Sequence, residues 1–127
     1  MSSRLFQALA LLGAGMAIAG CSRGDAPTAA AAAVPVEQVP ATIEQAFAAA
    51  PPETKETARE VTAAVTGGDT VRAFEELQHL TSQPSLTPAQ RDAAARSMVA
   101  LHERLRTSAE KGDKKAEEAL EQYRATK

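Results

Sequence analysis

From about residue 41 to residue 127, prolines and Gly-Asp pairs divide this chain into short segments. Within each segment the apolar residues recur three and four positions apart, the spacing of one face of an α-helix. No segment alternates apolar and polar residues over the length of a strand. The sequence therefore predicts an all-α fold, a small helical hairpin or bundle. Its helices are expected at about 42–50, 52–66, 69–82, 88–111 and 113–124.

Two of these helices begin with a capping-box spacing, in which a Thr side chain caps the helix three residues before a Gln. Thr42 and Gln45 have this spacing at the first helix. Thr87 and Gln90 have it at the fourth, where Pro88 also takes the first helical position that proline favours. We therefore expect Thr42 and Thr87 to be N-cap residues.

The predicted core is thin. Between residues 53 and 127, only eleven of 75 residues are Leu, Ile, Val or Phe, and alanine fills many of the remaining apolar positions. Such a core leaves little surplus over the conformational entropy lost on folding. We therefore expect the domain to pack against a second copy or a protein partner. The inward positions are predicted to be Ala58, Val61, Ala64, Val65, Val71, Phe74, Leu77, Leu80, Ala94, Met98, Leu101, Leu105, Ser108, Ala116, Leu120 and Tyr123.

A Gly-Asp pair occurs at 68–69 and again at 112–113, each time between two predicted helices. The stretch 68–77, Gly-Asp-x-x-x-Ala-x-x-x-Leu, resembles the second helix of a tetratricopeptide repeat, whose known forms bind peptides or partner proteins. Thr57 and Glu60 stand where the first helix of that repeat has apolar residues, and the second pair follows after 44 residues rather than 34. The alternative is that each pair is simply a helix stop followed by a helix cap.

The first 20 residues are predicted to be a signal peptide. A short start with one cation, Arg4, precedes an apolar run from Leu5 to Ala19 that is interrupted only by Gln7. Fifteen residues are too few for a transmembrane helix, which needs about 20.

The tetrad Ile18-Ala19-Gly20-Cys21 resembles the lipobox of bacterial lipoproteins, and Cys21 is the single Cys of the chain. The resemblance implies cleavage between Gly20 and Cys21, lipidation of the Cys21 thiol, and anchoring in a membrane of the cell envelope. Ser22, which is not Asp, is similar to the residue that directs such proteins to the outer membrane, facing the periplasm. The alternative is an ordinary secretory signal followed by an incidental Cys. A lone Cys also excludes a disulfide within one chain.

Residues 21–40 are predicted to be the lipidated Cys and a disordered linker. This segment carries Pro27, Pro35 and Pro40 and a run of five alanines at 29–33, with few large side chains. Each proline removes a backbone donor and disfavours helix in the residue before it. We therefore expect a semi-extended tether that leads to a helical domain over 41–127.

Catalytic, cofactor and metal sites are not predicted, and neither is nucleic-acid binding. His79 and His102 have no Cys or second His at ligand spacing, and we expect them at the surface or at its boundary with the core. The acidic pairs at 75–76 and 117–118 are expected to be solvated faces. A formal net charge of −2 gives no electrostatic basis for binding nucleic acid. The chain is therefore predicted not to be an enzyme.

The end of the sequence, Tyr123-Arg124-Ala-Thr-Lys127, is similar to the end of the murein lipoprotein, in which the terminal lysine is joined to peptidoglycan. Ala125-Thr126 interrupts that match, and the continuous heptads of the family are missing. Three functions therefore remain open from the sequence. They are a membrane-tethered helical interaction or structural module, an envelope carrier or chaperone for apolar ligands or segments, and a peptidoglycan-linked structural lipoprotein.

Overall fold

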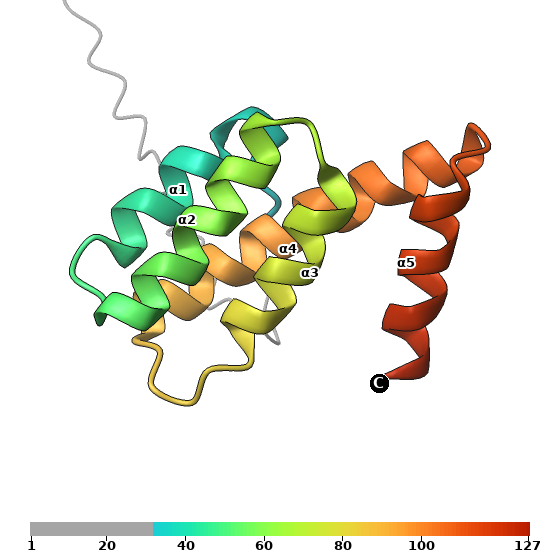
Figure 1. Cartoon of the computed structure of the whole chain (residues 1–127). Helices are drawn as coiled ribbons and strands as arrows, with labels where there is room; N and C mark the ends of the chain where they lie inside the picture. The colour runs from blue at the N-terminus through green and yellow to red at the C-terminus, as the bar shows by residue number, and fades with distance from the viewer. Residues whose placement is uncertain (1–31) are drawn as a thin grey trace, which may run out of the picture.

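The computed structural model describes residues 32–127, and all regular structure within them is helical (Figure 1). The predicted all-α class is therefore confirmed for this part of the chain. The elements are the 3-10 helix η1 (Val36–Gln38) and the α-helices α1 (Val39–Phe47), α2 (Pro52–Thr66), α3 (Thr70–Thr81), α4 (Pro88–Glu110) and α5 (Lys114–Ala125).

The first four α-helices close into a ring around one core. Each packs against the next along the chain, and α1 also packs against α4. The largest fully buried side chains come from all four helices: Val39, Ile43, Phe47, Val61, Phe74, Leu77, Leu80, Leu101 and Leu105. The C-terminal half of α4 extends beyond the ring, and α5 descends from its end (Figure 1). α5 packs mainly on α4, with a smaller contact to α3.

The boundaries of the last four helices lie within about one residue of those predicted, because local caps determine them. The Thr87 capping box is confirmed: the Gln90 amide donates to Thr87 Oγ1 at 3.2 Å, and Gln90 Oε1 accepts from the Thr87 amide at 3.0 Å. Asp69 accepts from the backbone amide of Arg72 at 3.1 Å and caps α3. Asp113 caps α5 in the same way.

Both Gly-Asp pairs form Schellman turns that end one helix and start the next. After α2, the Asp69 amide donates to the Ala64 carbonyl at 2.9 Å and the Gly68 amide to the Val65 carbonyl at 3.1 Å. The equivalent two bonds after α4 measure 3.1 and 2.9 Å. Gly68 and Gly112 adopt φ of 76° and 93°, a region that costs little only for glycine. The aspartate that completes each turn also caps the following helix.

The predicted start of the first helix is wrong. α1 begins at Val39 rather than near 42, so Thr42 lies inside the helix and is not its N-cap. The error comes from reading Pro40 as a helix breaker. In the first turn of a helix the backbone amide has no intrahelical acceptor, so Pro40 costs nothing there and its fixed φ suits the helix.

The predicted linker also ends too late. Val34 and Val39 are buried in the core, and η1 lies between them. Arg96 Nε of α4 donates to the Ala32 carbonyl at 3.2 Å, and Glu37 lies 3.8 Å from the guanidinium of Arg104. Residues 34–40 therefore belong to the helical domain. Residues 21–31 lie outside the part of the chain that the structure describes.

Most of the predicted inward positions are buried. Ser108 is half-buried, and Val65, Val71, Met98 and Tyr123 are half-buried against the core. Along α4 the buried face is wider than the predicted seam. It also includes Gln90, Ala93, Ser97 and Ala100, because α4 contacts η1, α1, α3 and α5 rather than one partner helix.

Candidate functional site

The two residues predicted to undergo chemistry, Gly20 and Cys21, lie outside the described residues. Their geometric relation to the domain can still be bounded. Val34 is the first buried residue among those described, so twelve residues separate it from Cys21. A fully extended chain advances about 3.3–3.6 Å per residue, which puts the domain within roughly 45 Å of Cys21.

The two histidines occupy different settings. His79 is exposed near the end of α3. His102 is half-buried on α4, in contact with two aromatic rings. Within residues 32–127, no group of three or more His, Cys, Asp and Glu side chains is arranged to hold a metal ion.

An aromatic cluster joins α3, α4 and α5. The rings of Phe74 and Tyr123 meet edge to face with their centroids 5.1 Å apart, and the His102 ring lies 6.1 Å from the first and 5.9 Å from the second. The Lys127 ammonium lies 4.7 Å from the centre of the Tyr123 ring. The sequence indicated Tyr123 as inward but gave no sign of this cluster, since its members are far apart in the chain. Its role is to fix α5 on the ring of helices.

A polar hollow of about 600 Å³ opens at the N-terminal ends of α3 and α5. Its charged groups have both signs, with Arg72, Arg104 and Lys115 beside Glu75 and Glu76. Two of its cations have partners, since Arg72 lies 3.6 Å from Glu60 and Arg104 lies 3.8 Å from Glu37. The hollow is therefore a solvated surface of balanced charge and does not concentrate one sign.

A smaller and more apolar hollow of about 240 Å³ lies between α1 and α2. Phe47, Ala48 and Ala58 form its floor, and the charged side chains of Glu44, Lys55 and Arg59 surround it. Pockets for small ligands usually enclose about 300–1,000 Å³ and cover most of the ligand. This hollow is shallower than such a site.

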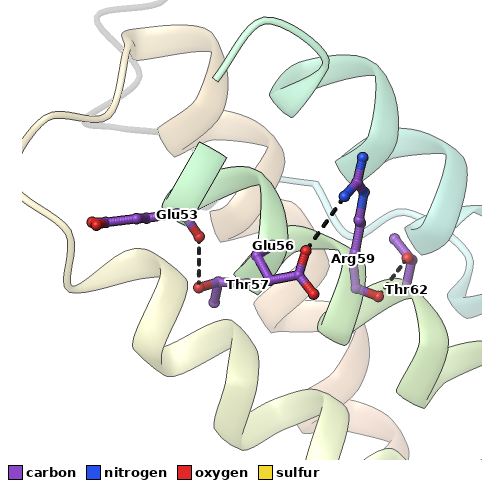
Figure 2. A network of polar contacts seen from close by, with 5 residues as sticks. All are labelled: Glu53, Glu56, Thr57, Arg59 and Thr62. Atoms are coloured by element: carbon purple, nitrogen blue, oxygen red, sulfur yellow. Dashed lines mark hydrogen bonds and ion pairs between the residues drawn. The ribbon is translucent and has the colours of Figure 1, made fainter. Parts of the chain in front are cut away.

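The polar contacts of α2 that Figure 2 draws are local. Arg59 Nη1 donates to Glu56 Oε2 at 3.3 Å, Thr57 Oγ1 to the Glu53 carbonyl at 3.3 Å, and Thr62 Oγ1 to the Arg59 carbonyl at 2.9 Å. Each contact joins residues three or four apart, which is the ordinary pairing on one helix. No two carboxylates converge in this network, so it supports the helix surface rather than an acid–base site.

Each acidic pair has one exposed and one half-buried member. Glu75 and Glu118 are exposed, and Glu117 accepts from Lys114 Nζ at 2.8 Å. That hydrogen bond raises the pKa of Lys114, and the nearby charge of Glu117 adds to the effect. On α4 a hydrogen bond from Arg106 lowers the pKa of Glu103, and the same bond raises the pKa of Arg106. The side chains of Glu103, Arg106 and Lys114 are all more than half exposed.

Comparison with known proteins finds no matching family model, no similar curated protein and no similar solved structure. Among the described helices, none is both long enough and apolar enough to cross a bilayer.

Proposed function

We propose that this chain is a bacterial lipoprotein that holds a small helical interaction module close to a membrane of the cell envelope. The observation that carries the proposal is the tetrad Ile18-Ala19-Gly20-Cys21 at the end of an apolar run, with the single Cys of the chain at its last position. The expected location is the outer membrane, with the domain facing the periplasm.

The surface of the domain supports an interaction role. Its surface carries paired and mixed charges, and the hollow of about 600 Å³ at the N-terminal ends of α3 and α5 is open and polar. A carrier of apolar ligands would need a roomier apolar cavity than the 240 Å³ hollow between α1 and α2. Among residues 32–127, Val99 is the one exposed large apolar side chain. The other large apolar side chains of this part of the chain are buried or half-buried within one copy.

The short tether limits where the module can act. With the domain starting at Val34 rather than near 41, the segment after Cys21 spans at most about 45 Å, and about 40 Å as a polyproline-like chain. The module is thus confined to a layer next to its membrane. Its partners would be other proteins held in, or passing close to, the same surface.

Replacement of Cys21 tests the anchor. Cys21→Ser removes the thiol that would carry the lipid, so the protein should lose palmitate labelling, keep its signal peptide and gain about 2 kDa in apparent mass from the 20 uncleaved residues. Ser22→Ala is the matched control and should be labelled and cleaved as the wild type is. Palmitate labelling that persists in Cys21→Ser, or a normally cut and soluble Cys21→Ser product, contradicts the proposal.

A further inference from the structure

One side of α4 has a regular composition and faces away from the other helices except at His102, which contacts Phe74 of α3 and Tyr123 of α5. Positions separated by three and four residues place seven side chains on one stripe, here called the α4 outer face: Asp92, Ala95, Arg96, Val99, His102, Glu103 and Arg106. All seven are exposed or half-buried. Val99, at the centre, is 42% exposed, and it is the one large apolar side chain so exposed among residues 32–127.

The charges on this face are arranged symmetrically about Val99. Reading along the helix, Asp92 is negative and Arg96 positive on one side, and Glu103 is negative and Arg106 positive on the other. Asp92 and Arg106 are each seven residues from Val99, and Arg96 and Glu103 are three and four residues from it. Reversing the direction of the helix therefore exchanges each of these two negative positions for a positive one, to within one residue. Glu110, four residues beyond Arg106, lies outside this pattern.

This order is self-complementary for two antiparallel helices. When two α4 helices cross at Val99 through a two-fold axis, Asp92 of one copy faces Arg106 of the other, and Arg96 faces Glu103. Both pairings then occur twice. Within one copy the same groups already pair along the helix, with Asp92 and Arg96 3.7 Å apart and Glu103 bonded to Arg106. In the dimer each of these charged groups would keep its partner on the same helix and gain a second partner on the other copy.

We propose that the α4 outer face binds a second copy of this chain, antiparallel and centred on Val99. Ala95 is small and lies one turn away on the same stripe, so the two helix backbones can approach closely. One helix face offers less contact than the roughly 1,200–2,000 Å² of a stable interface. The association is therefore weak in dilute solution and depends on copies being concentrated on one surface. The concentration of copies on one surface rests on the proposed membrane anchor, whereas the geometry of the interface does not.

A cysteine at the centre of the face tests the contact directly. In the proposed dimer, the two Val99 side chains meet on the axis, so Val99→Cys should form a disulfide between copies when membranes carrying the full chain are treated with copper–phenanthroline. Ala63→Cys is the control, because Ala63 is also exposed on a helix but lies on α2. The expected result is a crosslinked dimer with Val99→Cys, and little with Ala63→Cys or with the wild type, whose single Cys is Cys21.

Charge exchange then separates this contact from random collision. In the Val99→Cys chain, Asp92→Arg alone and Arg106→Asp alone each place like charges opposite one another twice, so the crosslinked fraction should fall about tenfold. The double exchange Asp92→Arg with Arg106→Asp restores opposite charges between copies and should restore crosslinking. It does not restore the pairs within one copy, which both become repulsive. Recovery in the double variant therefore reports contacts between copies.

Each outcome decides the proposal. Equal crosslinking of Val99→Cys and Ala63→Cys, or a double variant that stays as low as the single ones, overturns it. Circular dichroism of each variant confirms that the exposed substitutions leave the helices intact. Repeating the experiment in detergent with the Cys21→Ser chain separates the two proposals. Crosslinking that survives there supports the interface whatever the fate of the anchor, and crosslinking that disappears only without the lipid supports the anchor's role in concentrating the copies.

Discussion

At the scale of single residues, Ser97 is the one side chain in the described core whose placement is unfavourable. It is fully buried on α4, and its hydroxyl has no hydrogen-bond partner within residues 32–127. Leaving a buried hydroxyl unpaired costs about 1–3 kcal/mol. Ser97→Ala removes the hydroxyl and leaves a side chain of similar size. We expect the free energy of unfolding to rise by about 1 kcal/mol, measured by urea unfolding of the helical signal.

A second serine on the same helix provides the control for that substitution. Ser108 is half-buried near the end of α4, so Ser108→Ala gains helix propensity without removing a fully buried hydroxyl. Ser97→Ala should therefore stabilise the domain more than Ser108→Ala does. A loss of stability in Ser97→Ala would show that its hydroxyl has a partner in solution.

At the scale of helices and turns, the two Schellman corners depend on glycine. Gly112 has φ of 93° and open space where a Cβ would stand, so a substitution there meets a backbone penalty and no clash. Gly112→Ala should lower the free energy of unfolding by about 1–2 kcal/mol. Gly112→Asn should cost less, since asparagine tolerates this conformation better. Equal losses for the two variants would point to some other cause.

A separate prediction at this scale concerns how α5 is held against α3 and α4. Tyr123 is the residue of α5 whose ring packs on Phe74 and His102, while the other inward residues of α5 are Ala116, Ala119 and Leu120. Tyr123→Ala removes the aromatic contact, so α5 should open locally while the ring of four helices stays closed. Hydrogen exchange should become about tenfold faster or more in α5 amides, with little change in α2 and α3.

Tyr123→Phe is the matched variant for α5, because it keeps the ring and removes only the hydroxyl. It should exchange as the wild type does. Acceleration spread evenly over all five helices in Tyr123→Ala would instead mean that α5 unfolds together with the rest of the domain.

The helix ends could be predicted from the sequence because their causes are local. Thr87 with Gln90, and each Gly-Asp pair, act within one turn of chain, and the structure has them as expected. The start of α1 was not predicted because Pro40 has opposite effects in the first turn and in the interior of a helix. Deciding between them requires knowing that Val34 and Val39 are buried, which depends on helices distant in the chain.

At the scale of the whole molecule, the arrangement of the helices could not be predicted from the sequence. The packing of α1 on α4 and the cluster of Phe74, His102 and Tyr123 join residues that lie more than twenty positions apart in the chain. Periodicity shows which face of a helix is inward but not which helix it meets. The predicted modification site at Cys21 depends on a short local motif, so the fold of the domain does not test that prediction.

At this scale the structure also indicates where the domain begins in the chain. Val34 is 6% exposed although it lies in the segment expected to be a linker, and Ala33 beside it is exposed. Val34→Asp would place a carboxylate in the core without a partner, and we expect the free energy of unfolding to fall by about 2–3 kcal/mol. Ala33→Asp places the same charge in solvent and should change the free energy of unfolding by less than about 0.5 kcal/mol.

Deleting residues 22–31 complements these two substitutions. If the domain starts near Val34, the deletion should leave the urea unfolding midpoint unchanged in a Cys21→Ser chain without its first 20 residues, because no residue of the core is removed. The same deletion in the lipidated chain shortens the segment between Cys21 and the domain from twelve residues to two, which brings the module against the membrane surface. Equal unfolding of Val34→Asp and Ala33→Asp, or a lower midpoint after the deletion, would place the start of the domain elsewhere.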